Sequence, residues 1–532
     1  MLLIIINNIL MTGGLIQLVA YGEQDLFLTD NPQITFFKML YRRHTNFSIE
    51  QIPQTFIHTP TFGKRVSCIL AKSGDLLGDI VLVVTLPEIP QLFNTDGSVD
   101  NLTKFAWIRK IGFGLIKEIE VEIGGQSIDK HYGKWLNIWA ELTGKRWDDI
   151  NKAIGNVPEL FTYSSSKQSY ELFIPLQFWF CRSSSLALPI MCLQYNDVKI
   201  NLELADASAC YNVTPTNYIL VQNDLVNFTP FEYISQTVNN NYAFGMFTSF
   251  DPLTGRLYYT QISNNPFLAI NDSNFYTYST TKQQEIIDQY AITGYSSGYS
   301  ASAYISASNK FSTSTTVNAV SYTFNTLANI RISDCFLLVS YIFLDDEERI
   351  KFYKSEHEYL IETLIYTGAS TLDGVNRNVK VGLINPCKLV VWTTQFDYLS
   401  GENINDIFNY TDSYIYDHDE QTGESIILNS SILMNGRTRF SMQDDIYLNC
   451  VQPYQYLTRA PTKGICMYSF GLLPEQIQPS GSCNMSKIDN IQISLKLSPM
   501  VSTSNTIIFE CYALSSNIFK IISGIAGVMF TN

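Results

Sequence analysis

Two stretches of alternating sequence decide the fold class. Residues 198–204 read Val-Lys-Ile-Asn-Leu-Glu-Leu, and residues 491–497 read Ile-Gln-Ile-Ser-Leu-Lys-Leu. An apolar residue at every second position is typical of a β-strand with one buried face. That face fills the core of a β-sandwich, while the other face meets solvent or a neighbouring sandwich. Because the two stretches lie far apart in the chain, each indicates a sandwich of its own.

The residues around the first stretch predict further strands, a hairpin and a short helix. Ile80–Pro87 is a continuous apolar run closed by proline, as in a buried strand. Ile119–Ile123 alternates and is followed by Gly124-Gly125, a pair typical of a tight hairpin turn. Two more elements are expected: a helix over His131–Leu142 with Trp135, Ile138, Trp139 and Leu142 on one face, and a strand over Leu172–Phe180.

The residues around the second stretch predict the same order of elements. Val379–Phe396 indicates a strand pair around Pro386, and Ser431–Gly436 ends in Asn-Gly, a strong hairpin signal. A short helix is expected to start within Asp444–Leu448, and a strand is expected over Ile465–Leu473. The chain therefore carries two copies of one strand-rich unit. We predict an all-β protein with two consecutive eight-stranded antiparallel jelly rolls, a double jelly roll with short helices.

Residues 205–330 break this pattern. They are rich in Tyr, Ser, Thr and Asn, as in GYSSGYSASAYISASNKFSTSTT at 294–316. This composition suits an unstructured linker, but the many aromatic residues favour a long ordered insertion that projects from the first jelly roll. The elements expected after it are a closing strand over Cys335–Leu344, a charged turn over Asp345–Arg349, and a linker helix over Arg349–Ile365, where apolar residues recur at helical spacing.

The composition limits the kinds of surface and partner. The 532 residues suggest two to four domains. Only 16% of the residues are charged, which favours a surface that contacts other protein chains; a solvated surface rich in Ser, Thr and Asn is the alternative. The formal net charge of −14 disfavours direct contact with nucleic acid, because its phosphates are also negative.

Cysteine spacing and the two chain ends argue against zinc ribbons and membrane spans. None of the 10 cysteines forms a CxxC pair, and their scatter is typical of buried thiols in a reducing compartment, with later disulfide formation as the alternative. Residues 1–10 lack the basic residues of a signal peptide and are either an upstream extension or an arm that packs on a neighbour or a membrane. Ile518–Phe530 is apolar but short and contains Lys520, so we expect a terminal strand or interface segment.

Three patterns partly match catalytic or metal-binding motifs. Gly294–Gly298 fits the GxSxG nucleophile elbow, but that motif requires a strand before it and a helix after it. His357-Glu358 begins a zinc-protease motif, yet Ile361 stands where the second histidine belongs. Asp345–Glu348 lacks the alternation of a calcium loop and better suits the approach to a helix. We therefore predict no catalytic, cofactor-binding or metal-binding residues, and expect that the protein is not an enzyme.

Two surface features concern modification and contact. Arg42, Arg43 and His44 form a compact basic spot, for which salt bridges within an oligomer are expected and contact with an anionic membrane is the alternative. Asn-x-Ser/Thr triplets arise by chance in an Asn- and Ser-rich chain, and sugars on the insertion are the alternative reading. The triplets begin at Asn46, Asn101, Asn212, Asn227, Asn271, Asn409, Asn429 and Asn484.

Residues 13–48 carry a resemblance to a known family. They read GGLIQLVAYGEQDLFLTDNPQITFFKMLYRRHTNFS and resemble the opening of the major capsid proteins of nucleocytoplasmic large DNA viruses, such as iridoviruses, phycodnaviruses and mimivirus-like viruses. Further similar blocks follow in family order and bracket most of the chain, with residues 205–330 outside the resemblance. These blocks are Ile123–His131, Phe173–Arg182, Leu186–Pro189, Ser340–Asp345, His357–Glu362, Met434–Phe440, Gln478–Asn484 and Tyr512–Asn532.

The resemblance implies a structural role. It implies a double jelly-roll protomer, a homotrimer with a pseudo-hexagonal outline, and capsomers that tile the icosahedral shell of a large double-stranded DNA virus. Three chains with two similar domains give six similar corners, which suits a closed ring. The implied location is the virion shell, after assembly in the host cytoplasm. The implied partners are neighbouring copies, minor capsid proteins and the penton protein, with an internal lipid membrane nearby and no direct contact with nucleic acid.

On this basis we divide the chain into parts. Residues 1–32 are expected to form an N-terminal arm at the capsomer base, 33–346 the first jelly roll, 347–378 the linker helix and connection, and 379–532 the second jelly roll. The insertion at 205–330 is expected to form an outward tower that contacts the host surface or carries glycans. The alternatives are a minor or paralogous capsid protein at special lattice positions, and a carbohydrate-binding or hydrolytic β-sandwich protein.

Overall fold

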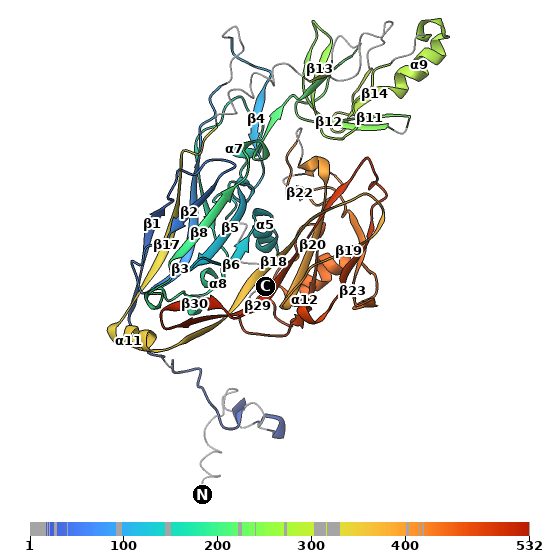
Figure 1. Ribbon diagram of the computed structural model, residues 1–532. Helices are drawn as coiled ribbons and strands as arrows, with labels where there is room; N and C mark the ends of the chain where they lie inside the picture. Colours follow the sequence, from blue (N-terminus) through green and yellow to red (C-terminus); the bar gives the residue numbers. More distant parts are fainter. Residues whose placement is uncertain are drawn as a thin grey trace, which may run out of the picture. The chain divides into compact units, whose positions relative to one another are not determined.

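The computed structural model describes residues 17–530, apart from 19, 21, 26–28, 40, 92–97, 144–149, 222–225, 240, 271–273, 303–314, 317–329, 401–403, 414 and 418–419. The chain divides into two compact units, Met1–Asn46 and Phe47–Asn532. In the first unit the described residues include a 3-10 turn, η2 (Glu23–Asp25), and extended chain. Side chains such as Phe36 and Phe37 are exposed there. The sheets described below belong to the second unit (Figure 1).

Eight strands form the first jelly roll. One antiparallel sheet has the order β1-β17-β3-β7 and the other β2-β8-β5-β6. Their inward side chains share one core, in which Leu82, Ile200 and Leu337 are fully buried. The strands are β1 (Phe47–Thr55), β2 (Arg65–Ile69), β3 (Leu76–Leu86), β5 (Ile116–Ile123), β6 (Gln126–His131), β7 (Tyr170–Pro175), β8 (Val198–Leu204) and β17 (Asp334–Leu344).

The second jelly roll repeats the first strand for strand. Its sheets have the orders β18-β29-β20-β26 and β19-β28-β23-β24. The alternating stretches at 198–204 and 491–497 are β8 and β28, equivalent strands in the two copies. The prediction of two consecutive jelly rolls is therefore confirmed. The strands are β18 (His357–Leu372), β19 (Asn376–Lys380), β20 (Pro386–Phe396), β23 (Ile427–Met434), β24 (Arg437–Thr438), β26 (Ile465–Ser469), β28 (Ile491–Leu497) and β29 (Ile507–Ile522).

Both predicted hairpins form, at equivalent places in the two copies. Gly124 and Gly125 join β5 to β6 with φ of 59° and 84°. Asn435 and Gly436 join β23 to β24 with φ of 49° and 78°. Positive φ at both central residues defines the turn whose twist matches that of the paired strands, and glycine and asparagine adopt it at little cost.

The predicted linker helix over Arg349–Ile365 is wrong beyond Lys354. Helix α11 spans Asp346–Lys354, and Asp345 caps it by accepting a hydrogen bond from the N–H of Asp346. The charged run at Asp345–Arg349 therefore starts a helix. From His357 the chain is the strand β18, which pairs with β29 along most of its length. Apolar residues there suit a helical spacing too, but β-branched and aromatic residues also favour strands, and the long pairing with β29 decides the outcome.

Two other predicted strands are too long. The strand expected over Leu172–Phe180 ends at Pro175, and helix α8 (Trp179–Arg182) follows. The strand expected over Ile465–Leu473 ends at Ser469. Past Pro175 the apolar run continues in the buried residues of α8, whereas past Ser469 it continues in Leu472 and Leu473, which are exposed. An apolar run alone therefore does not mark where a strand ends. The two helices that follow the hairpins do form: α5 (Gly133–Leu142), and a helix over residues 445–456 that contains the π-helical η8 (Tyr447–Val451) and α12 (Gln452–Tyr456).

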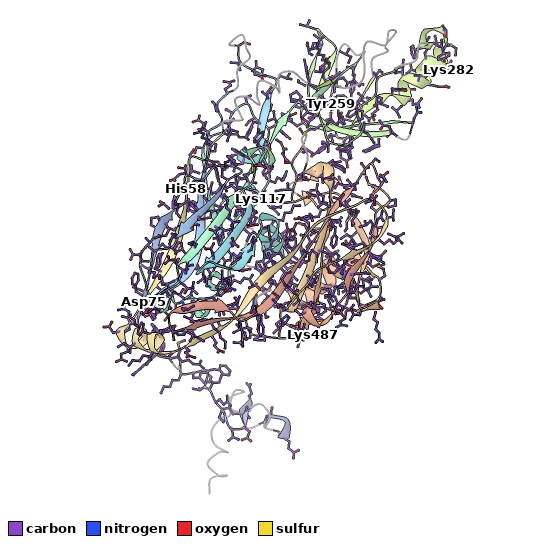
Figure 2. The ribbon with its side chains drawn as sticks, viewed as in Figure 1. His58, Asp75, Lys117, Tyr259, Lys282 and Lys487 are labelled. Atoms are coloured by element: carbon purple, nitrogen blue, oxygen red, sulfur yellow. The ribbon has the colours of Figure 1, made fainter. Side chains whose placement is uncertain are left out.

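The described residues of the 205–330 insertion include a sheet of their own. Its order is β15-β14-β11-β12-β13-β10-β16, and helix α9 (Thr280–Gln289) lies beside it. Tyr259 lies in this sheet (Figure 2), fully buried, with its ring 4.8 Å from that of Phe267. The strands are β10 (Asn217–Leu220), β11 (Tyr233–Val238), β12 (Asn241–Asp251), β13 (Arg256–Gln261), β14 (Ala291–Gly294), β15 (Ser300–Ser302) and β16 (Thr315–Thr316).

The cysteines, all of which lie in the described residues, are free thiols, and most are buried. Burial raises the pKa of Cys68 to about 11 and that of Cys335 and Cys387 to about 12. Cys450 is exposed. The apolar C-terminal stretch lies in β29 and β30 (Ile525–Val528), so the terminal strand expected there is confirmed. Within the described residues, no helix has the length and apolarity needed to span a membrane.

Candidate functional site

The GxSxG sequence lies in a hairpin. Gly294 ends β14, and the chain turns back into β15 at Ser300, so no helix follows Ser296 in this hairpin. The buried carboxylate of Glu232 accepts hydrogen bonds from the N–H groups of Ser296 and Ser297, at 3.1 and 2.8 Å. Glu232 therefore fixes the shape of the turn, and the strand–turn–helix geometry of a nucleophile elbow is absent here.

The other two motifs are also used structurally. His357 starts β18, where its Nε2 lies 2.7 Å from the carbonyl oxygen of Phe352 and 3.7 Å from Sγ of Cys192. Ile361, four residues on, is buried in the core of the first jelly roll. Asp345 caps α11. Across the described residues, no group of three or more His, Cys, Asp or Glu side chains is arranged to hold a metal ion.

The basic residues and the asparagines of the Asn-x-Ser/Thr triplets differ in solvent exposure. Arg42, Arg43 and His44 are exposed in the first unit. Of the Asn-x-Ser/Thr triplets, Asn409 is fully buried, Asn212 and Asn429 are half-buried, and Asn271 is outside the described residues. The exposed ones are Asn46, Asn101, Asn227 and Asn484.

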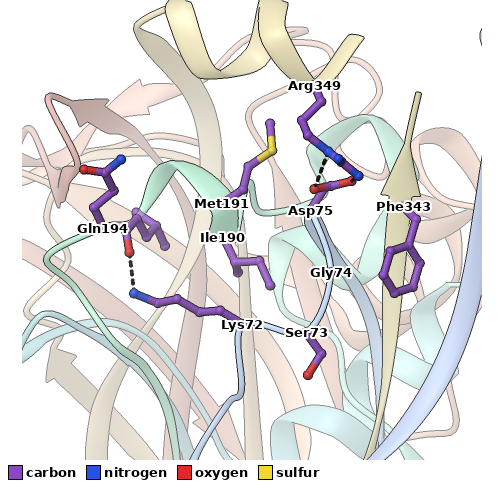
Figure 3. Close-up of a pocket in the computed structure, with 10 residues that line it drawn as sticks. Lys72, Ser73, Gly74, Asp75, Ile190, Met191, Gln194, Phe343 and Arg349 are labelled. Atoms are coloured by element: carbon purple, nitrogen blue, oxygen red, sulfur yellow. Dashed lines mark hydrogen bonds and ion pairs between the residues drawn. The ribbon is translucent and has the colours of Figure 1, made fainter. Parts of the chain in front are cut away.

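A pocket opens where residues 72–75, just before β3, and residues 190–194 meet β17 and α11 (Figure 3). Its charged groups already have partners: Arg349 binds the carboxylate of Asp75 with Nε–Oδ1 at 3.0 Å, and Lys72 donates to the carbonyl oxygen of Leu193. Asp75 also accepts from the N–H of Leu344 at 2.8 Å. These bonds fix the start of α11 against the first jelly roll, which is a structural role.

Helix α5 of the first jelly roll covers a sheet of the second. Trp135, Ile138, Trp139 and Leu142, predicted on one face, pack against the outer face of β20, β26 and β29. This outer face is the side of the sheet turned away from its own core. Figure 1 shows α5 between the two jelly rolls. The sheet residues beneath the helix are Leu389, Val391, Ile465, Met467, Tyr512 and Leu514, each at most 1% exposed.

Ion pairs join the jelly rolls around this apolar contact. Glu362 on β18 binds Arg182 of α8 at 2.6 Å, and it also binds Lys388 on β20. Lys134 of α5 binds Glu510 on β29 at 2.8 Å. Burial lowers the pKa of Lys388, whereas Glu362 opposes that change. All these side chains are at least partly buried, so the pairs fix how one jelly roll sits on the other.

A fourth polar contact uses Glu141 at the end of α5. One carboxylate oxygen binds Lys110 at 2.7 Å, and the other accepts from the N–H and hydroxyl of Thr462 in the second jelly roll. Burial alone would raise the pKa of Glu141, but Lys110 and Thr462 together lower it. The sequence predicts the apolar face of α5 but none of these pairs, because their members lie up to 376 residues apart.

Comparison with known proteins agrees with this architecture. Residues 35–243 match the family model "Major capsid protein N-terminus", and residues 348–527 match "Large eukaryotic DNA virus major capsid protein". The first match runs to residue 243, so the family resemblance extends past residue 205, into the stretch that was placed outside it; the bounds 205–330 of the insertion stay a prediction.

Individual relatives match along nearly the whole chain. "Probable capsid protein 4" of Acanthamoeba polyphaga mimivirus is 39% identical over 98% of this chain and 99% of its own length. The major capsid protein of Phaeocystis pouchetii virus is 30% identical over 98% and 100%. Among solved structures, the quasi-atomic model of the PBCV-1 virus capsid superimposes with a TM-score of 0.58 and 23% identity, covering 94% of this chain and all of that one. The chain belongs to the family of major capsid proteins of large eukaryotic DNA viruses and is a structural protein of the virion shell, not an enzyme.

Proposed function

We propose that three copies of this chain form a pseudo-hexagonal capsomer, and that such capsomers tile an icosahedral shell. The observation that carries the proposal is the strand-for-strand repeat within one chain, held by the contact at α5. Three chains with two equivalent domains each give a ring with six similar corners, and such rings pack into flat sheets.

The mass of the purified native protein tests this proposal. The expected value is three times the chain mass of 60.4 kDa, measured by light scattering coupled to size-exclusion chromatography. A monomer at every concentration would overturn it.

We further propose roles for the two segments outside the jelly rolls. Residues 1–32 lie at the base of the capsomer, toward an internal lipid membrane and the minor capsid and penton proteins, and residues 205–330 point outward as a tower that contacts the host surface or carries glycans. In the segment 1–32, Leu18 is an exposed apolar side chain, which suits contact with other subunits or lipid. Antibodies against each segment test the assignment on intact virions: labelling is expected with the 205–330 antibody and not with the 1–32 antibody. The reverse pattern would contradict it.

A further inference from the structure

The two jelly rolls differ in one contact. In the second, a helix of the other jelly roll covers the outer sheet face; in the first, the equivalent face is not covered by the equivalent helix. In the first jelly roll, α5 connects β6 to β7 and packs on the outer face of the second jelly roll. In the second jelly roll, the equivalent connection between β24 and β26 is the 445–456 helix. Its equivalent target is the outer face of the first jelly roll, the β1-β17-β3-β7 sheet.

The 445–456 helix exposes an apolar stripe. Ile446, Cys450 and Tyr454 follow one another at intervals of four residues, and all three are exposed, with Tyr454 at 85%. Residues four apart lie on the same face of a helix. A run of exposed apolar side chains along one helix face suits a surface that another chain covers.

The outer face of the first jelly roll matches the face that α5 covers at five of the six sheet positions. The exception is Ile465, whose equivalent is the exposed Glu171. In the second jelly roll Val391 pairs with Tyr512 on one side and Met467 on the other. In the first, Val83 pairs in the same register with Phe336 and Phe173. The next outward pair also corresponds, Leu389 with Leu514 and Val81 with Leu338.

These matched positions differ in exposure. The positions under α5 are at most 1% exposed. In the first jelly roll Val83 is buried, but Phe173 is 41% exposed, and Val81, Phe336 and Leu338 are partly exposed. The apolar face is therefore built as its equivalent is built, and lacks the covering helix.

We propose that the 445–456 helix of one copy packs on the outer face formed by β3, β7 and β17 of the next copy, as α5 packs within the chain. This inference rests on the proposed trimer and names its contact surfaces. The occupant is a second copy because the chain itself holds both halves of the contact. Since the two halves differ, the contact is head-to-tail, and in the proposed trimer three such contacts close a ring.

Two acidic substitutions test the two halves separately. Tyr454→Asp and Phe173→Asp are each expected to weaken trimer formation at least tenfold in sedimentation velocity, because each places a carboxylate in an apolar contact. Leu253→Asp is the control, since Leu253 is an exposed apolar residue of the insertion and lies outside the proposed contact. Thermal denaturation of each monomer verifies that the variants are folded.

Cross-linking gives a second test that leaves the proposed contact between copies intact. Phe173→Cys places a thiol on the face that the helix stripe carrying the native Cys450 of the next copy is proposed to cover. A short bis-maleimide should then yield covalent dimers and trimers, and Cys450→Ser in the same background should abolish them. If both acidic variants form trimers like the wild type and no Cys450-dependent ladder appears, the contact is wrong while the trimer stands. If the wild type is monomeric, the proposed function fails instead.

Discussion

Glu362 is a single carboxylate that holds two cations, Arg182 and Lys388, between the jelly rolls. Replacing it with alanine would leave both cations buried without their counter-charge, which is more costly than the loss of the attraction itself. We expect Glu362→Ala to lower the free energy of unfolding by about 3 kcal/mol or more in chemical denaturation.

Glu358 on the same strand offers a matched control. It binds Lys520 but is 59% exposed. Glu358→Ala should cost less than about 1 kcal/mol, because water screens an exposed pair. Equal losses for the two variants would show that Glu362 has no special role between the jelly rolls.

Glu141 gives the contact a dependence on pH. In the unfolded chain its carboxyl titrates near 4.5, and in the folded protein its pKa is lower. A lowered carboxyl pKa contributes stability that is fully present above pH 4.5 and is lost as the pH falls through the folded value. Glu141→Gln should therefore be less stable than the wild type at neutral pH, and the difference should shrink in acid. A difference that stays constant down to about pH 2 would contradict this assignment.

At the scale of elements, α5 and the 445–456 helix are equivalent in the repeat but differ in what they cover. Trp135 of α5 is fully buried, with its ring 5.6 Å from that of Tyr512. Trp135→Ala should lower the free energy of unfolding by about 3–5 kcal/mol, the usual cost of removing a large buried aromatic side chain. Tyr454→Ala should leave the stability of the isolated chain nearly unchanged, since Tyr454 is exposed there. Thermal melts of the two variants at subunit concentrations too low for assembly measure the contrast.

The sequence predicts some of these elements and contacts but not others. The sequence predicts the strands at 198–204 and 491–497 with their observed bounds. Each strand buries one face, and one-sided burial requires an apolar residue at every second position. The first part of β18, from His357 to Ile365, is wrongly predicted as a helix. Its strand structure depends on the pairing with β29, whose residues are distant in the sequence. The charged pairs between the jelly rolls carry no local signal, since neither partner is unusual among its own neighbours. The sequence blocks ending at Arg182 and Glu362 nevertheless meet in one of these pairs, which gives the family resemblance a physical basis.

At the scale of the molecule, the contact at α5 makes the two jelly rolls mutually dependent. The core of the first jelly roll includes Ile361, Phe519 and Ile521 of the second, and α5 completes the outer face of the second. We expect residues 47–530 to unfold in a single calorimetric transition, with the calorimetric and van't Hoff enthalpies equal. Two separate transitions would show that each jelly roll is stable alone.

The burial of the cysteines bears on the life of the particle outside the cell. Only a thiolate reacts readily with oxidants or disulfides, and the raised pKa values of Cys68, Cys335 and Cys387 keep these groups protonated at neutral pH. A shell built from such subunits can move from reducing cytosol to oxygenated water without random cross-linking between its parts. Cys450 is the exposed exception, and it lies on the helix stripe that the next copy is proposed to cover. Closing the ring would then also cover this exposed thiol, so that assembly itself shields Cys450 from oxidants.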